Sequence, residues 1–325
     1  MFENCPFLSY ANSCIRYNLI FSRQYGFRKG SSTLSATCDL LEDIYDSLDN
    51  KKLAGAVFID LKKAFDTINH ALLIRKLEFF GFRGVSKSLI GSYLTDRLQF
   101  VALGNSCSDE RFIRTGVPQG SNLDPILFLL FINDICKLNL EGSLCLFADD
   151  TSIFYKVTQR PAVQRQMEQD LVLLHDYFRS NMLSLNLRKT KYMFMHSPRR
   201  RITPHLPLKI QGQEVEEVRE YVFLGLTLDS TLSWSAHIHR LKMKLSSLCG
   251  VLRKVTSFIP QKWLLKLYIP LPAAIFGCYL GFSLQIESAR TSGHSKPSFL
   301  EGCVYVLSTL EEVCFYLRLN NCFIV

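Results

Sequence analysis

Two adjacent carboxylates, Asp149 and Asp150, stand between two apolar runs typical of β-strands, residues 144–146 and 153–155. A third acid, Asp60, ends another apolar run further upstream. Most Asp-Asp pairs are turn or surface acids. Acids at the ends of two strands can instead hold two divalent metal ions, which stabilise the attacking and leaving oxygens of a phosphoryl transfer. The pattern favours a two-metal site if the strands bring the three acids together.

The surrounding pattern predicts a mixture of helices and strands, and we expect the fold class α+β. In the first half we expect a helix that Ser31 or Ser32 caps and that ends near residue 48, a strand over 53–60, helices over 66–80 and 86–95, and a strand over 98–103. In the second half we expect a turn at 116–121, a buried helix over 126–132, the acidic hairpin, a helix from Pro161, a strand over 191–195, and two short strands after residue 208.

The net charge of +9 favours a polyanionic partner. The eleven cysteines form no CxxC motif and no Cys/His zinc spacing, which indicates reduced intracellular thiols and no zinc site. His237 and His239 are interpreted as surface residues. The first six residues lack the features of a signal peptide. We therefore expect an intracellular protein of the nucleus or cytoplasm, not a secreted one.

Two segments near the C-terminus differ sharply in character. Residues 267–286 are uncharged and long enough for a membrane span, but they contain two prolines and two polar residues, so a buried segment is favoured and no membrane partner is expected. Residues 230–286 contain no acid and seven Lys or Arg, with apolar residues from 238 to 255 spaced by three and four. This is a basic amphipathic helix, either a solvated or coiled-coil arm or a helix lying along a nucleic-acid backbone.

Seven ordered blocks resemble the reverse transcriptase of non-LTR (LINE-type, jockey-like) retrotransposons, over about residues 15–268. They are QYGFRKG at 24–30, VFIDLKKAFD at 57–66, SYLTDR at 92–97, GVPQGS at 116–121, FADD at 147–150, LN with KTK within 185–191, and FLG at 223–225. The resemblance implies a right-hand polymerase: partial fingers at 1–54, a palm with an antiparallel sheet and inserted finger elements at 55–229 (reverse transcriptase core about 15–229), a basic helical thumb at 230–286, and a divergent or truncated tail at 287–325.

The resemblance also implies a role for individual residues. Asp60, Asp149 and Asp150 would bind two Mg²⁺ ions, for which Mn²⁺ can substitute. Lys189 would act on the departing pyrophosphate as a general acid or a neutralising charge. Without the resemblance, Asp149 and Asp150 would be interpreted as turn or surface acids and Lys189 as a solvated surface lysine.

Further implied roles concern substrate contacts. Phe65 would lie beneath the incoming sugar and exclude a 2′-hydroxyl, while Asp66 would be structural. The other contact residues are Gln119 and Gly120 at the nucleotide and template, Phe223, Leu224 and Gly225 as the primer grip, and Arg240, Lys242 and Lys244 on the duplex. Without the resemblance, Phe65 is a core aromatic and Gln119 a turn residue.

The sequence departs from the family pattern at several points. Asn122 stands where the family has an aliphatic residue, and Asp124 where it has glycine, so an extra carboxylate is expected to disturb the template side. No family-like basic fingers block precedes Gln24, and no endonuclease domain lies upstream. We expect an incomplete copy.

The leading functional hypothesis is an RNA-directed DNA polymerase that uses an RNA template, a DNA primer and deoxynucleoside triphosphates. One alternative is an inactive remnant that only binds RNA or RNA–DNA duplex. A second is a two-metal nuclease, which would leave the GVPQGS block and the primer grip without a role.

Overall fold

A five-stranded sheet lies at the centre of the computed structural model, which describes residues 19–118, 120–121, 123–198, 207–255 and 258. The strand order is β11-β8-β1-β7-β6. These are Glu216–Glu217, Lys191–Met195, Leu53–Ile59, Asp150–Val157 and Ser143–Phe147. All pairs are antiparallel except β11 with β8, which are parallel. The sheet expected around the acids is therefore present.

Strand β1 is the middle of this sheet and is buried along its whole length. It pairs with β7 from Leu53↔Val157 to Ile59↔Thr151. Because the pairing is antiparallel, the end of β1 lies beside the start of β7. Asp60 and Asp150 therefore share one edge of the sheet.

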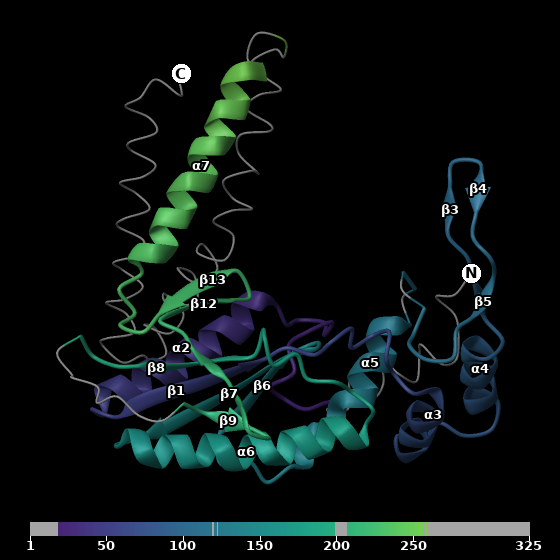
Figure 1. Ribbon diagram of the computed structural model, residues 1–325, viewed down its shortest axis with the longest axis horizontal. Coiled ribbons are helices and arrows are strands. Elements are labelled where there is room, and N and C mark those ends of the chain that lie inside the picture. Colours follow the sequence, from purple (N-terminus) through teal and green to yellow (C-terminus); the bar gives the residue numbers. More distant parts are fainter. Residues whose placement is uncertain (1–18, 119, 122, 199–206, 256–257, 259–325) are drawn as a thin grey trace.

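The two faces of the sheet pack into two separate cores, as the alternation of side chains along a strand requires. Val57 and Ile59 pack with apolar residues of α6 (Arg160–Ser180), whereas Ala56 and Phe58 pack with α2 (Thr33–Asp49). Figure 1 shows α6 below the sheet and α2 on the opposite face. The Ser32 side chain caps α2 by accepting a hydrogen bond from the Ser35 amide at 3.2 Å.

Three helices and a 3-10 turn lie between the main sheet and residues 97–115 at the other end of the structure (Figure 1). They are α3 (His70–Phe79), α4 (Val85–Leu94), α5 (Asp124–Ile132) and η1 (Asn133–Lys137). The prediction that a helix starts at residue 66 is wrong, because residues 61–68 form a loop in which the Asp66 amide bonds to the Lys63 carbonyl. Asn69 then caps α3 by accepting from the Leu72 amide at 3.0 Å.

The region predicted as one strand over 98–103 is instead a two-stranded ribbon, defined here as residues 97–115 (Figure 1). β2 (Leu98–Gln99) pairs with β5 (Arg111–Phe112), and β3 (Ala102–Leu103) pairs with β4 (Ser106–Cys107). The chain reverses after β3 at Gly104, which takes a φ of 58°. All four strands are exposed, so no buried face extends them into the main sheet.

The last elements of the described chain lie on both faces of the sheet. The hairpin of β9 (Lys209–Ile210) and β10 (Gln213–Glu214) packs on the α6 side, where Ile210 joins the same core as the apolar residues of α6. A second layer over the α2 face comprises β12 (Glu220–Phe223), β13 (Leu226–Asp229) and α7 (Ser235–Val255). The β12–β13 turn consists of Leu224 and Gly225, both at positive φ, which is the type I′ pattern of tight hairpins.

Helix α7 leaves the sheet on the same side as the ribbon, at the other end of the molecule (Figure 1). Its first turns are fixed by Ile238 and Leu241, which are buried, and by His237. The interpretation of His237 as a surface residue is wrong: it is 5% exposed and its Nδ1 accepts from the Thr227 amide at 3.1 Å. Burial lowers the pKa of His237 to about 4, so the imidazole is neutral.

Among the residues that the structure describes, no helix is both long and apolar enough to cross a membrane. The uncharged segment 267–286 and the tail 287–325 lie outside these residues.

Candidate active site

The acid hairpin joins β6 to β7 through only two residues, Ala148 and Asp149. Phe147 pairs with Asp150 across this turn, and Ala148 takes a φ of 56°. Asp60 follows the Ile59↔Thr151 pair on the neighbouring strand. The structure therefore places Asp60, Asp149 and Asp150 at one sheet edge, as the sequence predicts.

Gathering the acids changes how they hold protons. Burial raises the pKa of Asp150 to about 6, and the charges of Asp149 and Asp60 contribute, while Lys189 opposes the shift. Burial and Asp60 likewise raise the pKa of Asp149. Burial, with Asp150 and Asp60, raises the pKa of Tyr221 to about 12. Negative charge at this edge is thus only partly compensated by the protein.

The raised pKa of Asp150 predicts how metal-free protein responds to pH. The folded pKa is about 6 against an ordinary 3.8, so the folded state binds the proton more tightly. Protonation of Asp150 therefore stabilises the folded state. This stabilisation is complete below the unfolded pKa and is lost as pH rises through the folded pKa. The melting temperature of Asp150→Asn, relative to wild type in EDTA, should therefore increase as pH rises through this window. A difference that is the same at every pH would contradict the assignment.

Asp60 is held by the turn between α6 and β8. The Asn186 side-chain amide donates to Asp60 Oδ2 at 2.8 Å, and the Asn186 backbone amide donates to the Asp60 carbonyl at 2.8 Å. Lys189 Nζ lies 3.9 Å from Asp60 Oδ1 and is largely exposed. Lys189 therefore lies beside Asp60, while its predicted role on the departing pyrophosphate stays a prediction. We missed the role of Asn186, although it stands in the same matching block.

Phe65 is a half-buried aromatic in the loop that follows Asp60. Its ring stacks on Phe128 with centroids 4.4 Å apart and meets the edge of Phe27 at 6.3 Å. Its carbonyl accepts from the Val117 amide at 3.0 Å. The GVPQGS turn is thereby tied to the loop of Phe65. Gly120 is exposed at a φ of 100°.

The loop before α5 contains Asp124, whose expected position on the template side is wrong. Asp124 does not face a template: it is 3% exposed and accepts from the Ser121 amide at 3.0 Å and from the Tyr93 hydroxyl at 3.1 Å. As the first residue of α5, its charge also favours the positive end of the helix dipole. Gln119 and Asn122 lie outside the described residues.

The tip of the β12–β13 hairpin carries the predicted primer grip. Phe223 is buried against Phe58, with centroids 5.9 Å apart, so its side chain supports the hairpin from beneath. Tyr221 stacks flat on Phe58 at 3.9 Å. Leu224 and Gly225 are the more exposed residues at the tip.

The three predicted cations of α7 have different surroundings. Arg240 donates to Thr227 Oγ1 at 3.2 Å and lies 3.7 Å from a Glu220 oxygen, so part of its charge is engaged. Lys242 and Lys244 are exposed.

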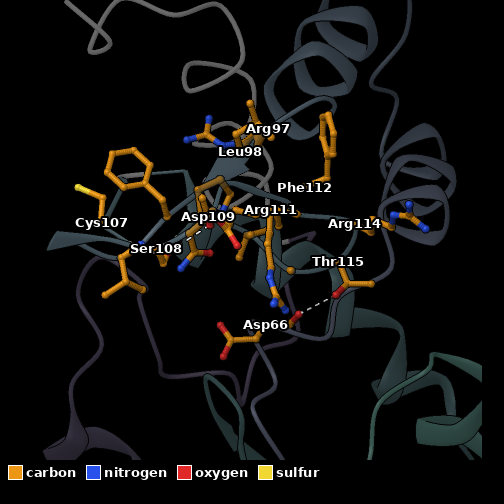
Figure 2. A pocket seen from close by; sticks show the side chains of 17 residues that line it. Asp66, Arg97, Leu98, Cys107, Ser108, Asp109, Arg111, Phe112, Arg114 and Thr115 are labelled. Carbon is orange, nitrogen blue, oxygen red and sulfur yellow. Dashed lines mark hydrogen bonds between the residues drawn. The ribbon is translucent and has the colours of Figure 1, made fainter. Parts of the chain in front are cut away.

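A cavity of about 1200 Å³ lies between the ribbon and the loop of Asp66. Figure 2 shows Arg111 extending from the ribbon towards Asp66, whose carbonyl accepts from Thr115 Oγ1 at 3.1 Å. Arg97 and Arg114 also line the cavity. The aromatic rings of its wall are exposed, and sequence reasoning did not anticipate this surface.

The donor set at the acid edge fits a hard divalent cation, because carboxylate oxygens are the ligands that Mg²⁺ prefers. The raised pKa values indicate that the acids repel one another. In the part of the chain that the structure describes, no group of three or more His, Cys, Asp or Glu side chains is arranged closely enough to hold a metal ion by itself. The acids are neighbours at one edge rather than a complete coordination shell.

Comparison with known families identifies the family to which the chain belongs. The sequence profile described as "Reverse transcriptase (RNA-dependent DNA polymerase)" matches residues 9–228. The chain belongs to the reverse transcriptase family. The matched span includes the acid hairpin, Asp60, Phe65 and Lys189, and members of this family use divalent metal ions.

Relatives from non-LTR retrotransposons support the same assignment. The chain is 31% identical over 223 residues to the probable RNA-directed DNA polymerase from transposon BS of Drosophila melanogaster, covering 66% of this chain and 24% of that protein. It is 27% identical over 226 residues to the polymerase from mobile element jockey of Drosophila funebris, covering 67% and 24%. The chain thus spans about a quarter of the length of these relatives. The resemblance found in the sequence is confirmed.

Among solved structures, the apo telomerase of Candida tropicalis truncated from its C-terminal domain is similar with a TM-score of 0.49. The sequence identity is 13%, over 71% of this chain and 45% of that chain.

Proposed function

We propose that this chain is the polymerase domain of a non-LTR retrotransposon reverse transcriptase, which extends a DNA primer on an RNA template. The supporting observation is the gathering of Asp60, Asp149 and Asp150 at one sheet edge with raised carboxyl pKa values. Repulsion between neighbouring carboxylates destabilises a fold, and a bound cation offsets this cost, so such a cluster is typical of a cation-binding site.

Asp60, Asp149 and Asp150 would hold two Mg²⁺ ions, for which Mn²⁺ can substitute. Bound there, the ions would neutralise charge on the attacking and leaving oxygens of nucleotidyl transfer. Asn186 orients the Asp60 carboxylate through its 2.8 Å hydrogen bond. Lys189 would neutralise or protonate the departing pyrophosphate, and its position 3.9 Å from Asp60 supports this role.

The nucleotide would lie between the acids and Phe65, with Gln119 and Gly120 on the template side. Phe65 is held by Phe128 at 4.4 Å, so its ring cannot retreat easily from an added 2′-hydroxyl. This packing supports selection of deoxynucleotides. Asp66 binds Thr115 through its carbonyl, which favours a structural role for this residue.

The five-stranded sheet corresponds to the palm and α7 to the thumb in this proposal. Domain limits of 1–54, 55–229, 230–286 and 287–325 follow for the fingers, palm, thumb and tail. The ribbon would be an inserted finger element, opposite α7 (Figure 1).

An RNA–DNA duplex would contact Leu224 and Gly225 at the hairpin tip and Lys242 and Lys244 on α7. Gly225, Lys242 and Lys244 are exposed and Leu224 is partly exposed, whereas Phe223 supports the tip from within. The arginine-lined cavity beneath the ribbon offers further contacts for phosphates or unpaired bases.

Replacing Arg240, Lys242 and Lys244 with alanine should flatten the salt dependence of duplex binding. Each phosphate neutralised contributes about 0.9 to the log–log slope on duplex DNA. We expect a smaller loss from Arg240 than from the two lysines, because Glu220 already pairs with it at 3.7 Å. Fluorescence anisotropy across a salt series measures the slope.

The matched control for this triple variant is alanine at Arg165, Arg179 and Lys209, which are exposed residues on or near α6. Because α6 covers the other face of the sheet, this control should leave the slope unchanged. A slope that falls equally in both variants, or in neither, would remove α7 from the interface.

A primer-extension assay on poly(rA) with oligo(dT), first with Mg²⁺ and then with Mn²⁺, tests the proposed function. The polymerase lengthens the primer with either metal. A remnant that only binds retains the duplex without extension, and a nuclease shortens it. Either of these results contradicts the proposal.

A further inference from the structure

A buried amide lies directly behind the acid hairpin. Gln24 is 2% exposed and forms a parallel bridge with Leu146 at the end of β6. The Leu146 amide donates to the Arg23 carbonyl and the Tyr25 amide donates to the Leu146 carbonyl, both at 2.9 Å. This pairing positions the Gln24 side chain at the hairpin tip. The proposed polymerase mechanism assigns no role to this side chain.

The Gln24 amide binds both polar backbone groups of Ala148. Its Oε1 accepts from the Ala148 amide at 3.0 Å and from the Gly26 amide at 2.9 Å, and its Nε2 donates to the Ala148 carbonyl at 3.4 Å. Two N–H groups pointing at one atom require that atom to be the oxygen, because a side-chain NH₂ accepts no hydrogen bond. One side chain therefore fixes the two peptide planes that flank Ala148.

Ala148 needs this support because of its conformation. Its φ of 56° lies in the left-handed region, which a residue with a Cβ seldom occupies. Gly26 closes the hairpin from the same side: a Cβ on Gly26 would lie 2.3 Å from the Ala148 nitrogen. The turn is thus held from behind by Gln24 and Gly26.

The fixed peptide planes determine where the acids point. The Ala148 carbonyl that Gln24 binds belongs to the peptide bond of Asp149, and Asp150 follows at the start of β7. We propose that Gln24 is a positioning residue that holds Asp149 and Asp150 in the orientation needed to bind divalent metal ions. The inference rests on the proposed function, because it deepens the same metal site.

A purely structural role is the competing explanation, since Gln24 also helps to fasten residues 19–26 to the sheet. Asn133 provides a matched control for this role. Its Oδ1 accepts from the Phe21 amide at 2.7 Å and its Nδ2 donates to the Leu19 carbonyl at 2.9 Å. Asn133→Ala therefore loosens the same segment through contacts that do not involve the acid hairpin.

Mn²⁺ binding, followed by electron paramagnetic resonance on the full chain, gives a readout that does not depend on activity. The variants are Gln24→Ala, the near-isosteric Gln24→Met, Asn133→Ala and Asp150→Asn. We expect both Gln24 variants to weaken Mn²⁺ binding by about 10-fold or more, as loss of partners behind metal ligands commonly does. Asn133→Ala should lower the melting temperature but leave Mn²⁺ affinity unchanged.

Primer extension then separates metal positioning from substrate binding. In the Gln24 variants, the Mg²⁺ concentration that gives half the maximal rate should rise by about 10-fold. The KM for primer–template should stay constant, because Gln24 is buried and reaches no nucleic acid.

Three outcomes would overturn the proposal. They are unchanged Mn²⁺ affinity in both Gln24 variants while Asp150→Asn loses binding, equal loss in the Gln24 variants and Asn133→Ala, and failure of both Gln24 variants to fold. The first two leave the polymerase function intact. A wild-type chain that binds Mn²⁺ without extending primers contradicts the polymerase, yet the Gln24 comparison still decides the positioning role. Absence of Mn²⁺ binding in wild type overturns both.

Discussion

Asp150→Asn is expected to abolish primer extension while duplex affinity stays nearly unchanged. Asparagine keeps the shape of the side chain but removes the charge that would bind metal. Loss of one preorganised electrostatic contact commonly costs about 10²–10³ in rate, and here the contact is to the ions themselves. Affinity depends instead on Lys and Arg that neutralise phosphates. Single-turnover extension and anisotropy on the same preparation measure the two quantities.

Asp149→Asn should behave in the same way, since Asp149 occupies the turn of the same hairpin. Asp176→Asn is the control, because Asp176 is an exposed acid of α6. Undiminished extension by both hairpin variants would remove the catalytic assignment of the hairpin. A parallel loss of duplex affinity would show that the acids act through folding instead.

Phe65→Ala should relax discrimination between deoxynucleotides and ribonucleotides. The Phe65 ring is wedged between Phe128 at 4.4 Å and Phe27 at 6.3 Å, so it has little freedom to make room for a 2′-hydroxyl. Removing the ring opens that space, and we expect the preference for dTTP over UTP to fall by about 10²-fold. The ratio of kcat/KM for the two substrates measures the effect.

Phe79→Ala serves as the matched control for Phe65→Ala. Phe79 is an aromatic at the end of α3 that is 87% exposed, and its loss should leave sugar selection unchanged. An unchanged ratio in Phe65→Ala, with extension retained, would show that this ring does not contact the sugar side. A ratio that changes equally in both variants would indicate a general loss of active-site order.

The elements that carry the chemistry were predictable because their sequences are locally unambiguous. The run before Asp60 is apolar at every position, as a strand buried on both faces requires. Ser32 was one of two predicted caps for α2, and its side chain makes the capping bond. The acid hairpin was predictable because two adjacent acids stand between two apolar runs.

Other features depend on partners far away in the sequence and were missed. Gln24 lies 124 residues from Ala148, and Asn186 lies 126 residues from Asp60. A polar side chain in a loop gives no local sign of such a partner. Asp124 was wrongly expected at the template side for the same reason, since its bond to Tyr93 spans 31 residues.

The ribbon shows a further limit of predicting strands from the spacing of apolar residues. Residues 98–103 contain enough apolar side chains to suggest one strand, yet all of them are exposed and the chain pairs with itself across Gly104. A two-residue strand has too few positions to show an alternating pattern. The burial of Phe223 was also not foreseeable, because it depends on Phe58 in β1.

Template-directed addition of a single nucleotide tests the central claim most directly. The chain is mixed with a primer on an RNA template of defined sequence and Mg²⁺, and each of the four deoxynucleotides is supplied alone. We predict that wild type adds only the nucleotide complementary to the next RNA base, and that Asp150→Asn adds none. Addition that ignores the template base, or that persists undiminished in Asp150→Asn, would contradict an RNA-directed polymerase built on these three acids.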